Sequence, residues 1–157
     1  MALGILAGAA AGAAGTTALN AATYLDMSVR GRPTSDAPDK LVETVAEHTT
    51  LAVPGEGETR DNRVSGLGAL SGIVTGVGVG AAFGLLRHLG VRTHPSFTAV
   101  LMGVSAMAAT DVSLAALRVS DPRTWKSTDW LSDLLPHLAY GAVAAATLHH
   151  LDRDRRT

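Results

Sequence analysis

The chain has 157 residues, no cysteine and few aromatic residues. The lack of cysteine excludes a disulfide framework, a thiolate metal site and a thiol nucleophile. Aromatic residues make up only 4% of the chain although 46% of its residues are hydrophobic, so small aliphatic side chains dominate its apolar part. The net charge of −1 provides no excess of basic residues, and we therefore predict no nucleic-acid partner.

Charge is also missing from one long stretch, residues 64–86, which contains no charged side chain. Within it, glycine recurs at every fourth position: Gly68, Gly72, Gly76, Gly80 and Gly84. In water each of these glycines would cost a helix about 1 kcal/mol relative to alanine, whereas in lipid small residues let helix backbones approach closely. The row extends over about 24 Å of helix, close to the ~30 Å of a bilayer core. This stretch predicts a transmembrane helix.

Charged residues make up 17% of the chain and concentrate in the connections between four apolar stretches. Length and hydropathy predict a membrane-spanning helix in each stretch. The four spans cover residues 2–25, 65–86, 95–117 and 130–151. The polar loop at residues 27–64 has an amphipathic pattern that predicts a short helix over residues 38–51, packed on protein or on the membrane surface. We thus predict one membrane domain, residues 1–157, with an all-α fold: an integral membrane four-helix bundle with glycine-mediated close packing.

A second, shorter glycine row lies in the first span, at Gly4, Gly8 and Gly12. A spacing of four follows one ridge of a helix and favours a right-handed crossing with a partner helix. Two interpretations stay open at this point. The two rows pack on each other within one chain, or one row faces a second copy or another membrane protein subunit.

Asp111 stands about seven residues before Arg118, which places it roughly 10 Å inside the third span. A carboxylate at that depth costs several kcal/mol, so we expect it to face the bundle or water and to be paired or protonated. One interpretation is a hydrogen bond to another helix, with Asn20, His137 or a serine as partner. The other is a proton or cation relay.

Asp133 and His137 lie four residues apart at the start of the fourth span, and Tyr140 follows one turn later. This spacing puts the carboxylate and the imidazole on one helix face, where they can hydrogen bond. The third and fourth spans are joined by a short connection and are expected to be antiparallel neighbours, which can bring Asp111 near His137. The three residues form the best candidate for a binding site, although a purely structural histidine is the alternative.

No arrangement of residues predicts catalysis. The chain has no nucleophile elbow, no phosphate-binding loop and no carboxylate pair with hydrolase spacing. His149 and His150 are adjacent in the sequence and cannot both reach one metal ion from a helix. We therefore predict a non-enzymatic protein with no cofactor and no metal.

The layout of residues 4–47, an alanine- and glycine-rich helix followed by a polar loop with proline and a short helix, resembles small bacterial inner-membrane proteins of the YagU-like type. The segment Leu-Pro-His-Leu-Ala-Tyr-Gly, residues 135–141, is similar to the histidine-bearing last helix of that group. These proteins are largely of unassigned function. The resemblance therefore implies only architecture and location, a multi-pass protein in the bacterial cytoplasmic (inner) membrane.

Two classes of function are consistent with these features. The first is a scaffold or accessory subunit that uses its glycine faces to join a homo- or hetero-oligomeric membrane complex, with the lipid bilayer and other subunits as partners. The second is a small proton- or cation-coupled transporter or channel that uses Asp111 and His137.

Overall fold

The computed structural model describes residues 1–153, and this part of the chain is all-helical. The α-helices are α1 (Ala2–Arg30), α2 (Ala37–His48), α3 (Gly57–His88), α4 (Pro95–Ala116) and α5 (Ser127–Arg153), with a 3₁₀ turn, η1 (Pro122–Thr124), before α5. Each predicted apolar segment coincides with a helix, and only the segment 95–117 ends one residue beyond its helix, at the C-cap Leu117 of α4. The two longest helices extend past these segments, because hydropathy detects only the apolar part of a helix whose polar turns continue into the connections.

Glycine and proline set several of the helix ends. Gly31 takes up a left-handed conformation, with φ of 63°, and ends α1 as its C-cap. Pro38 lies in the first turn of α2 and Pro95 begins α4, where the missing backbone N–H has no helical partner to lose. The predicted amphipathic helix therefore exists as α2, which is shorter than expected because the backbone becomes extended at Thr49.

Three helices, α1, α3 and α4, are long and apolar enough to cross a membrane. Helix α5 has 27 residues but is not one of them. Its first half carries Asp129, Asp133 and His137, and its last turns carry further polar and charged residues. The chain thus has the features of a membrane protein, whereas a fourth span in α5 stays a prediction.

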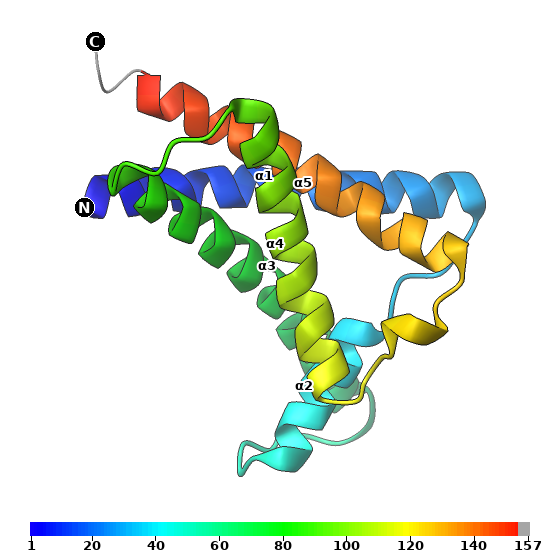
Figure 1. Cartoon of the computed structure of the whole chain (residues 1–157). Coiled ribbons are helices and arrows are strands. Elements are labelled where there is room, and N and C mark those ends of the chain that lie inside the picture. Colours follow the sequence, from blue (N-terminus) through cyan, green and yellow to red (C-terminus); the bar gives the residue numbers. More distant parts are fainter. Residues whose placement is uncertain (154–157) are drawn as a thin grey trace.

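The helices converge at one end of the molecule and diverge at the other (Figure 1). The N-terminus, the connection between α3 and α4, and the last turns of α5 lie toward the converging end. From there α1 and α5 run to one side while α3 and α4 run to the other (Figure 1). Helix α2 packs against α3 at the diverging end, and η1 spans between the two arms there.

Helices α1 and α3 approach so closely that several positions have no room for a side chain. A Cβ atom on Gly8 would overlap the carbonyl oxygen of Gly80, and a Cβ atom on Gly80 would overlap that of Gly8. A Cβ atom on Gly12 would lie 2.5 Å from the carbonyl oxygen of Gly76. The two backbones therefore touch directly along this part of the converging half.

A second close approach joins α4 and α5. A Cβ atom on Gly141 would overlap the carbonyl oxygen of Ala99, and one on Gly103 would lie 2.7 Å from the carbonyl oxygen of His137. These glycines were not among the packing residues predicted from the sequence. The only signal was that each is the single glycine of its apolar segment.

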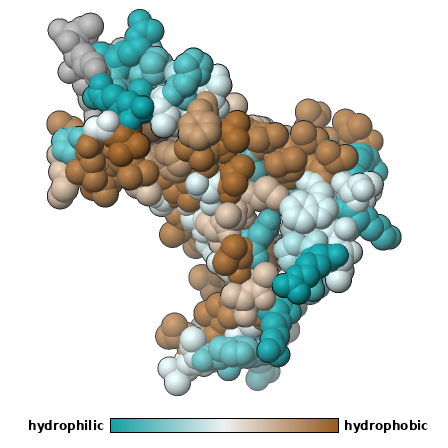
Figure 2. Space-filling model, viewed as in Figure 1, coloured by the Kyte–Doolittle hydropathy of each residue, from teal (hydrophilic) through white to brown (hydrophobic). Residues whose placement is uncertain are grey.

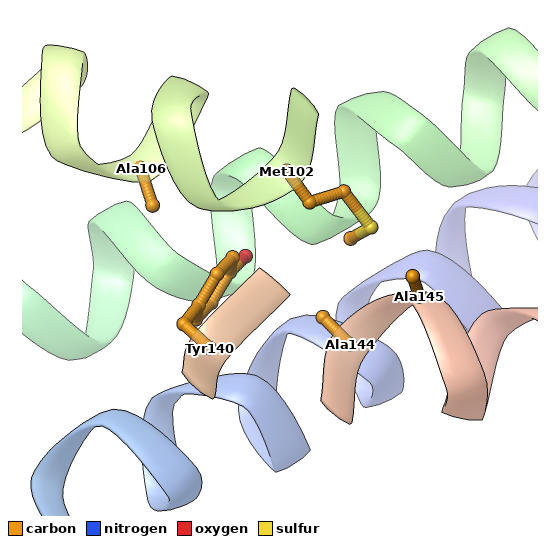
Figure 3. Close-up of a cluster of buried hydrophobic side chains, with 5 residues drawn as sticks. All are labelled: Met102, Ala106, Tyr140, Ala144 and Ala145. Atoms are coloured by element: carbon orange, nitrogen blue, oxygen red, sulfur yellow. The ribbon is translucent and has the colours of Figure 1, made fainter. Parts of the chain in front are cut away.

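The main core cluster lies where α4 and α5 meet, and it consists of Met102, Ala106, Tyr140, Ala144 and Ala145 (Figure 3). Tyr140 is fully buried, and its hydroxyl group points toward α3 (Figure 3). The hydroxyl donates a hydrogen bond of 2.6 Å to the carbonyl oxygen of Gly76. One side chain of α5 is therefore bonded to the backbone of α3.

Many large apolar side chains face outward instead of entering this core. They include Leu6, Ile73, Val74, Phe97, Val104 and Val112, which lie on the three membrane-length helices. In Figure 2, hydrophobic atoms cover much of the middle of the molecule, and hydrophilic atoms gather near α2, η1 and the end of α5. An apolar exterior of this extent is typical of a surface that contacts lipid or another protein.

We predict that Gly80→Ala lowers the free energy of unfolding by about 1–3 kcal/mol, because the added methyl group overlaps the backbone of α1. The measurement is reversible unfolding in detergent micelles. Gly78→Ala is the matched control, since a methyl group there meets no atom within 4 Å. The control should keep or slightly gain stability, because alanine favours the helix. Equal losses in the two variants would contradict the prediction.

We also predict that Tyr140→Phe costs about 1 kcal/mol of unfolding free energy, because it removes the buried hydrogen bond to Gly76 without changing the ring. The same unfolding assay measures this loss. Tyr24→Phe is the control, since Tyr24 is 61% exposed. A Tyr140→Phe variant as stable as the unmodified protein would show that the hydroxyl group contributes nothing to the fold.

Candidate functional site

A cavity of about 700 Å³ lies between the diverging halves of the helices. Its wall is formed by α1 from Thr16 onward, by the first half of α3, by the second half of α4 and by the first half of α5. Residues of α2 and of the segment around η1 complete its rim. The cavity therefore occupies the part of the bundle where α1 and α5 have separated from α3 and α4 (Figure 1).

The structure brings all five predicted polar residues of the spans to this cavity. Asn20 comes from α1, Asp111 from α4, and Asp133, His137 and Tyr140 come from α5. Spacing along one helix could place only the last three together. The addition of Asn20 and Asp111 is a result of how the helices cross.

The predicted contact between Asp133 and His137 is present in the structure. Nδ1 of His137 lies 3.3 Å from Oδ1 of Asp133 and 2.8 Å from the backbone carbonyl oxygen of the same residue. Both neighbours are hydrogen-bond acceptors, so Nδ1 must carry a proton whatever the charge of the ring. His137 is only 8% exposed. Its orientation is therefore fixed, and Nε2 is the nitrogen that can gain or lose a proton.

The other carboxylate oxygen of Asp133 has unmet bonding capacity. Oδ2 is buried and has no hydrogen-bond partner within residues 1–153. Asp111, on the facing helix α4, interacts electrostatically with both Asp133 and His137. Two carboxyl groups and one imidazole thus share a small region of the cavity. A proton or a cation would relieve the repulsion between the carboxylates and supply the missing bond.

The basic residues at the rim, Arg32 and Lys40, pair with acidic residues other than these carboxyl groups, and the acid that binds Arg32 is shared with Arg30. Nε of Arg32 lies 2.5 Å from Oδ2 of Asp26, and Nζ of Lys40 lies 2.7 Å from Oδ2 of Asp36. The hydrogen bond from Lys40 lowers the pKa of Asp36 below its ordinary value, which keeps this exposed pair charged. The carboxyl groups inside the cavity are therefore available to bind a positively charged ligand.

Aromatic rings lie at the outer part of the cavity. Trp125 lines it, packs edge to face on Trp130 with ring centroids 5.1 Å apart, and donates a hydrogen bond of 3.0 Å to the hydroxyl group of Ser120. Tyr24 lines the cavity from α1. Tryptophan in a connection next to an apolar helix is typical of the membrane interface. No sequence signal pointed to Trp125 as a cavity residue, because its position depends on the path of the loop.

The structure divides the long glycine row among three environments. Gly76, Gly80 and Gly84 face Gly12, Gly8 and Gly4 of α1 and the residues around them. Gly68 lies against Pro38 and Asp39 of α2, and Gly72 lines the cavity with no atom of another helix within 4 Å of a Cβ placed there. Three of the five glycines of the long row therefore lie beside α1.

In the described part of the chain, no group of three or more His, Asp or Glu side chains is arranged to hold a metal ion. The chain matches no model of a known protein family, and searches of curated proteins and of solved structures found no significant match.

Proposed function

We propose that this is a small, non-enzymatic, multi-pass protein of a bacterial cytoplasmic membrane that binds and transports a proton or a small cation. The observation that supports this function best is the single cavity lined by Asp111, Asp133 and His137, in which the negative charge is not balanced by the basic residues of the rim. Ionisable residues within spanning helices are costly, and they commonly mark ion pathways and proton relays.

The proposal includes α5 as the fourth span of a four-helix bundle. Its hydropathy is low because Asp133 and His137 lie on it, and both face the cavity instead of lipid. Helix α5 packs against both α1 and α4, which are themselves long and apolar enough to cross a membrane. Partly polar helices of this kind can cross a bilayer when neighbouring helices cover their polar face.

The glycine contacts belong to the same proposal. We take them to be the close packing that holds the four helices together in lipid, where association depends on backbone approach and on hydrogen bonds. Because Gly76, Gly80 and Gly84 of α3 lie against α1, these three positions are not free to join another subunit. This favours transport over a scaffold that assembles through its glycine faces.

Proton movement through this site would use groups that already lie near each other. Nε2 of His137 can accept a proton while Nδ1 keeps its bonds to Asp133. Asp111 can then hold the proton or attract the cation that replaces it, since it interacts with both residues across the helix interface. The same carboxyl groups would then bind either the proton or the cation. Release of one would accompany binding of the other, and this exchange would couple the movements of the two.

We predict that Asp111→Asn lowers proton flux at least about tenfold, because the amide removes the titratable oxygen but keeps the side-chain shape. The purified protein is reconstituted in liposomes that contain a pH-sensitive dye, and an imposed potassium diffusion potential drives proton uptake. Asp61→Asn is the matched control, because Asp61 is exposed on the polar first turns of α3 and does not line the cavity.

The control should transport like the unmodified protein. Equal flux in the Asp111→Asn and Asp61→Asn variants would remove Asp111 from the mechanism. Absence of flux in the unmodified protein, for protons and for sodium in separate assays, would overturn the transport proposal itself.

A further inference from the structure

We infer that the cavity binds a primary or secondary organic ammonium ion that carries an apolar, arene-sized body. This inference rests on the proposed function in one respect, namely that the cavity is the binding site. It goes further by assigning the chemical class of the guest.

The size of the cavity leaves room for more than a bare ion. A volume of about 700 Å³ lies within the range of roughly 300–1,000 Å³ that is typical of pockets for organic ligands. A metal ion would need several ligands at short distance, and the described residues provide no group of three or more acidic or imidazole side chains so arranged. We therefore take the cation that exchanges with the proton to be an organic one.

The charge of the cavity favours a guest that is a cation. Asp111 and Asp133 interact with each other inside the cavity, and the only ion-pair partner of Asp133 within residues 1–153 is His137. Arg32 at the rim is bonded to Asp26 and cannot reach inward without giving up that pair. A cationic guest can replace the proton that would otherwise relieve the repulsion between the two carboxyl groups, whereas a neutral guest cannot.

The carboxyl group of Asp133 favours a guest that donates hydrogen bonds. Its Oδ2 is buried without a partner in the described structure, and a buried acceptor without a donor costs about 1–3 kcal/mol. The Asp133 side chain as a whole is 23% exposed, and a primary or secondary ammonium group provides N–H donors that can bond to its carboxyl group. A quaternary ammonium group has the same charge but no N–H, so it cannot form the bond.

The other residues that line the cavity suit an apolar group on the bound ion. Leu19 of α1, Ile73 of α3 and Leu114 of α4 contribute aliphatic surface, and Trp125 and Tyr24 contribute aromatic surface near the rim. Aromatic faces attract cations and also pack on apolar groups. An ion with a charged head and a compact apolar body therefore matches both parts of the cavity.

The test is isothermal titration of the full-length protein in detergent micelles with three probes of similar size. They are 2-phenylethylammonium, its N,N,N-trimethyl derivative and 2-phenylethanol. We expect the primary ammonium ion to bind at least about tenfold more tightly than the neutral alcohol and several-fold more tightly than the quaternary ion. Comparable affinity for the alcohol, or no heat of binding with any probe at millimolar concentration, would overturn the inference.

Binding to variants of the protein tests whether the ammonium ion binds in this cavity. Asp133→Asn should weaken binding of the primary ammonium ion at least about tenfold, while Asp61→Asn should leave it unchanged. Circular dichroism and size-exclusion chromatography check that each variant is folded. Tight binding that persists in a folded Asp133→Asn variant would contradict the inference. The comparison of the three probes on the unmodified protein decides the matter if that variant does not fold.

The outcome is distinguishable from failure of the proposed function. Proton flux without ammonium binding would leave transport standing and would overturn the assignment of the guest. Ammonium binding that depends on Asp133, without flux of protons or of the probe, would support the guest and overturn transport.

Discussion

Two direct contacts between helix backbones determine the shape of this protein. Gly8 and Gly80 bring α1 against α3, and Gly103 and Gly141 bring α4 against α5, at positions where an added side-chain atom would collide with the facing helix. Helices that touch at one point and cross at an angle must separate as they move away from it. The converging half is therefore closely packed, and the diverging half leaves an open cavity of about 700 Å³. In lipid, where apolar side chains gain little by leaving their solvent, such contacts between small residues are an effective way to hold helices together.

Tyr140 marks the boundary between the packed half and the cavity. Its ring is part of the buried core, and its hydroxyl group donates to the carbonyl oxygen of Gly76, which is where the glycine contact of α3 with α1 ends. Beyond this point the polar residues Asp111, Asp133 and His137 begin. Their location follows from the cost of burying charge, because carboxyl groups are unfavourable both in lipid and in a close-packed core. The cavity is the one environment of this half of the bundle in which they can be solvated or bound by a guest.

The sequence predicted the features that depend on residues close together in the chain, but it did not predict where the helices cross one another. Apolar length and charge segregation located the helices, and the spacing of four between Asp133 and His137 predicted their contact, because both depend on residues close in the chain. The division of the glycine row between α1, α2 and the cavity could not be predicted, since Gly72 and Gly76 have the same sequence pattern and differ only in what faces them. The position of Trp125 depends on the path of a loop, and that of Asn20 on the angle at which α1 crosses the other helices. Helix α5 is not among the helices apolar enough to cross a membrane, and two of its polar residues, Asp133 and His137, line the cavity.

A transport pathway needs access from both sides of the membrane, and the converging end provides a second, smaller opening. A pocket of about 270 Å³ lies there, lined by Gly4, Gly84 and Arg87 among others. The contact between Gly8 and Gly80 separates it from the main cavity along α1 and α3. Arg87 contacts α5 at this end: its Nε lies 3.3 Å from Oδ2 of Asp152, a partly exposed ion pair of the kind that contributes at most about 1 kcal/mol. Phe83 of α3 also packs against the buried cluster of Ala7, Ala11 and Leu148. A movement that connects the two pockets would therefore have to separate the glycine contact of α1 with α3 and also shift the apolar contacts of Phe83.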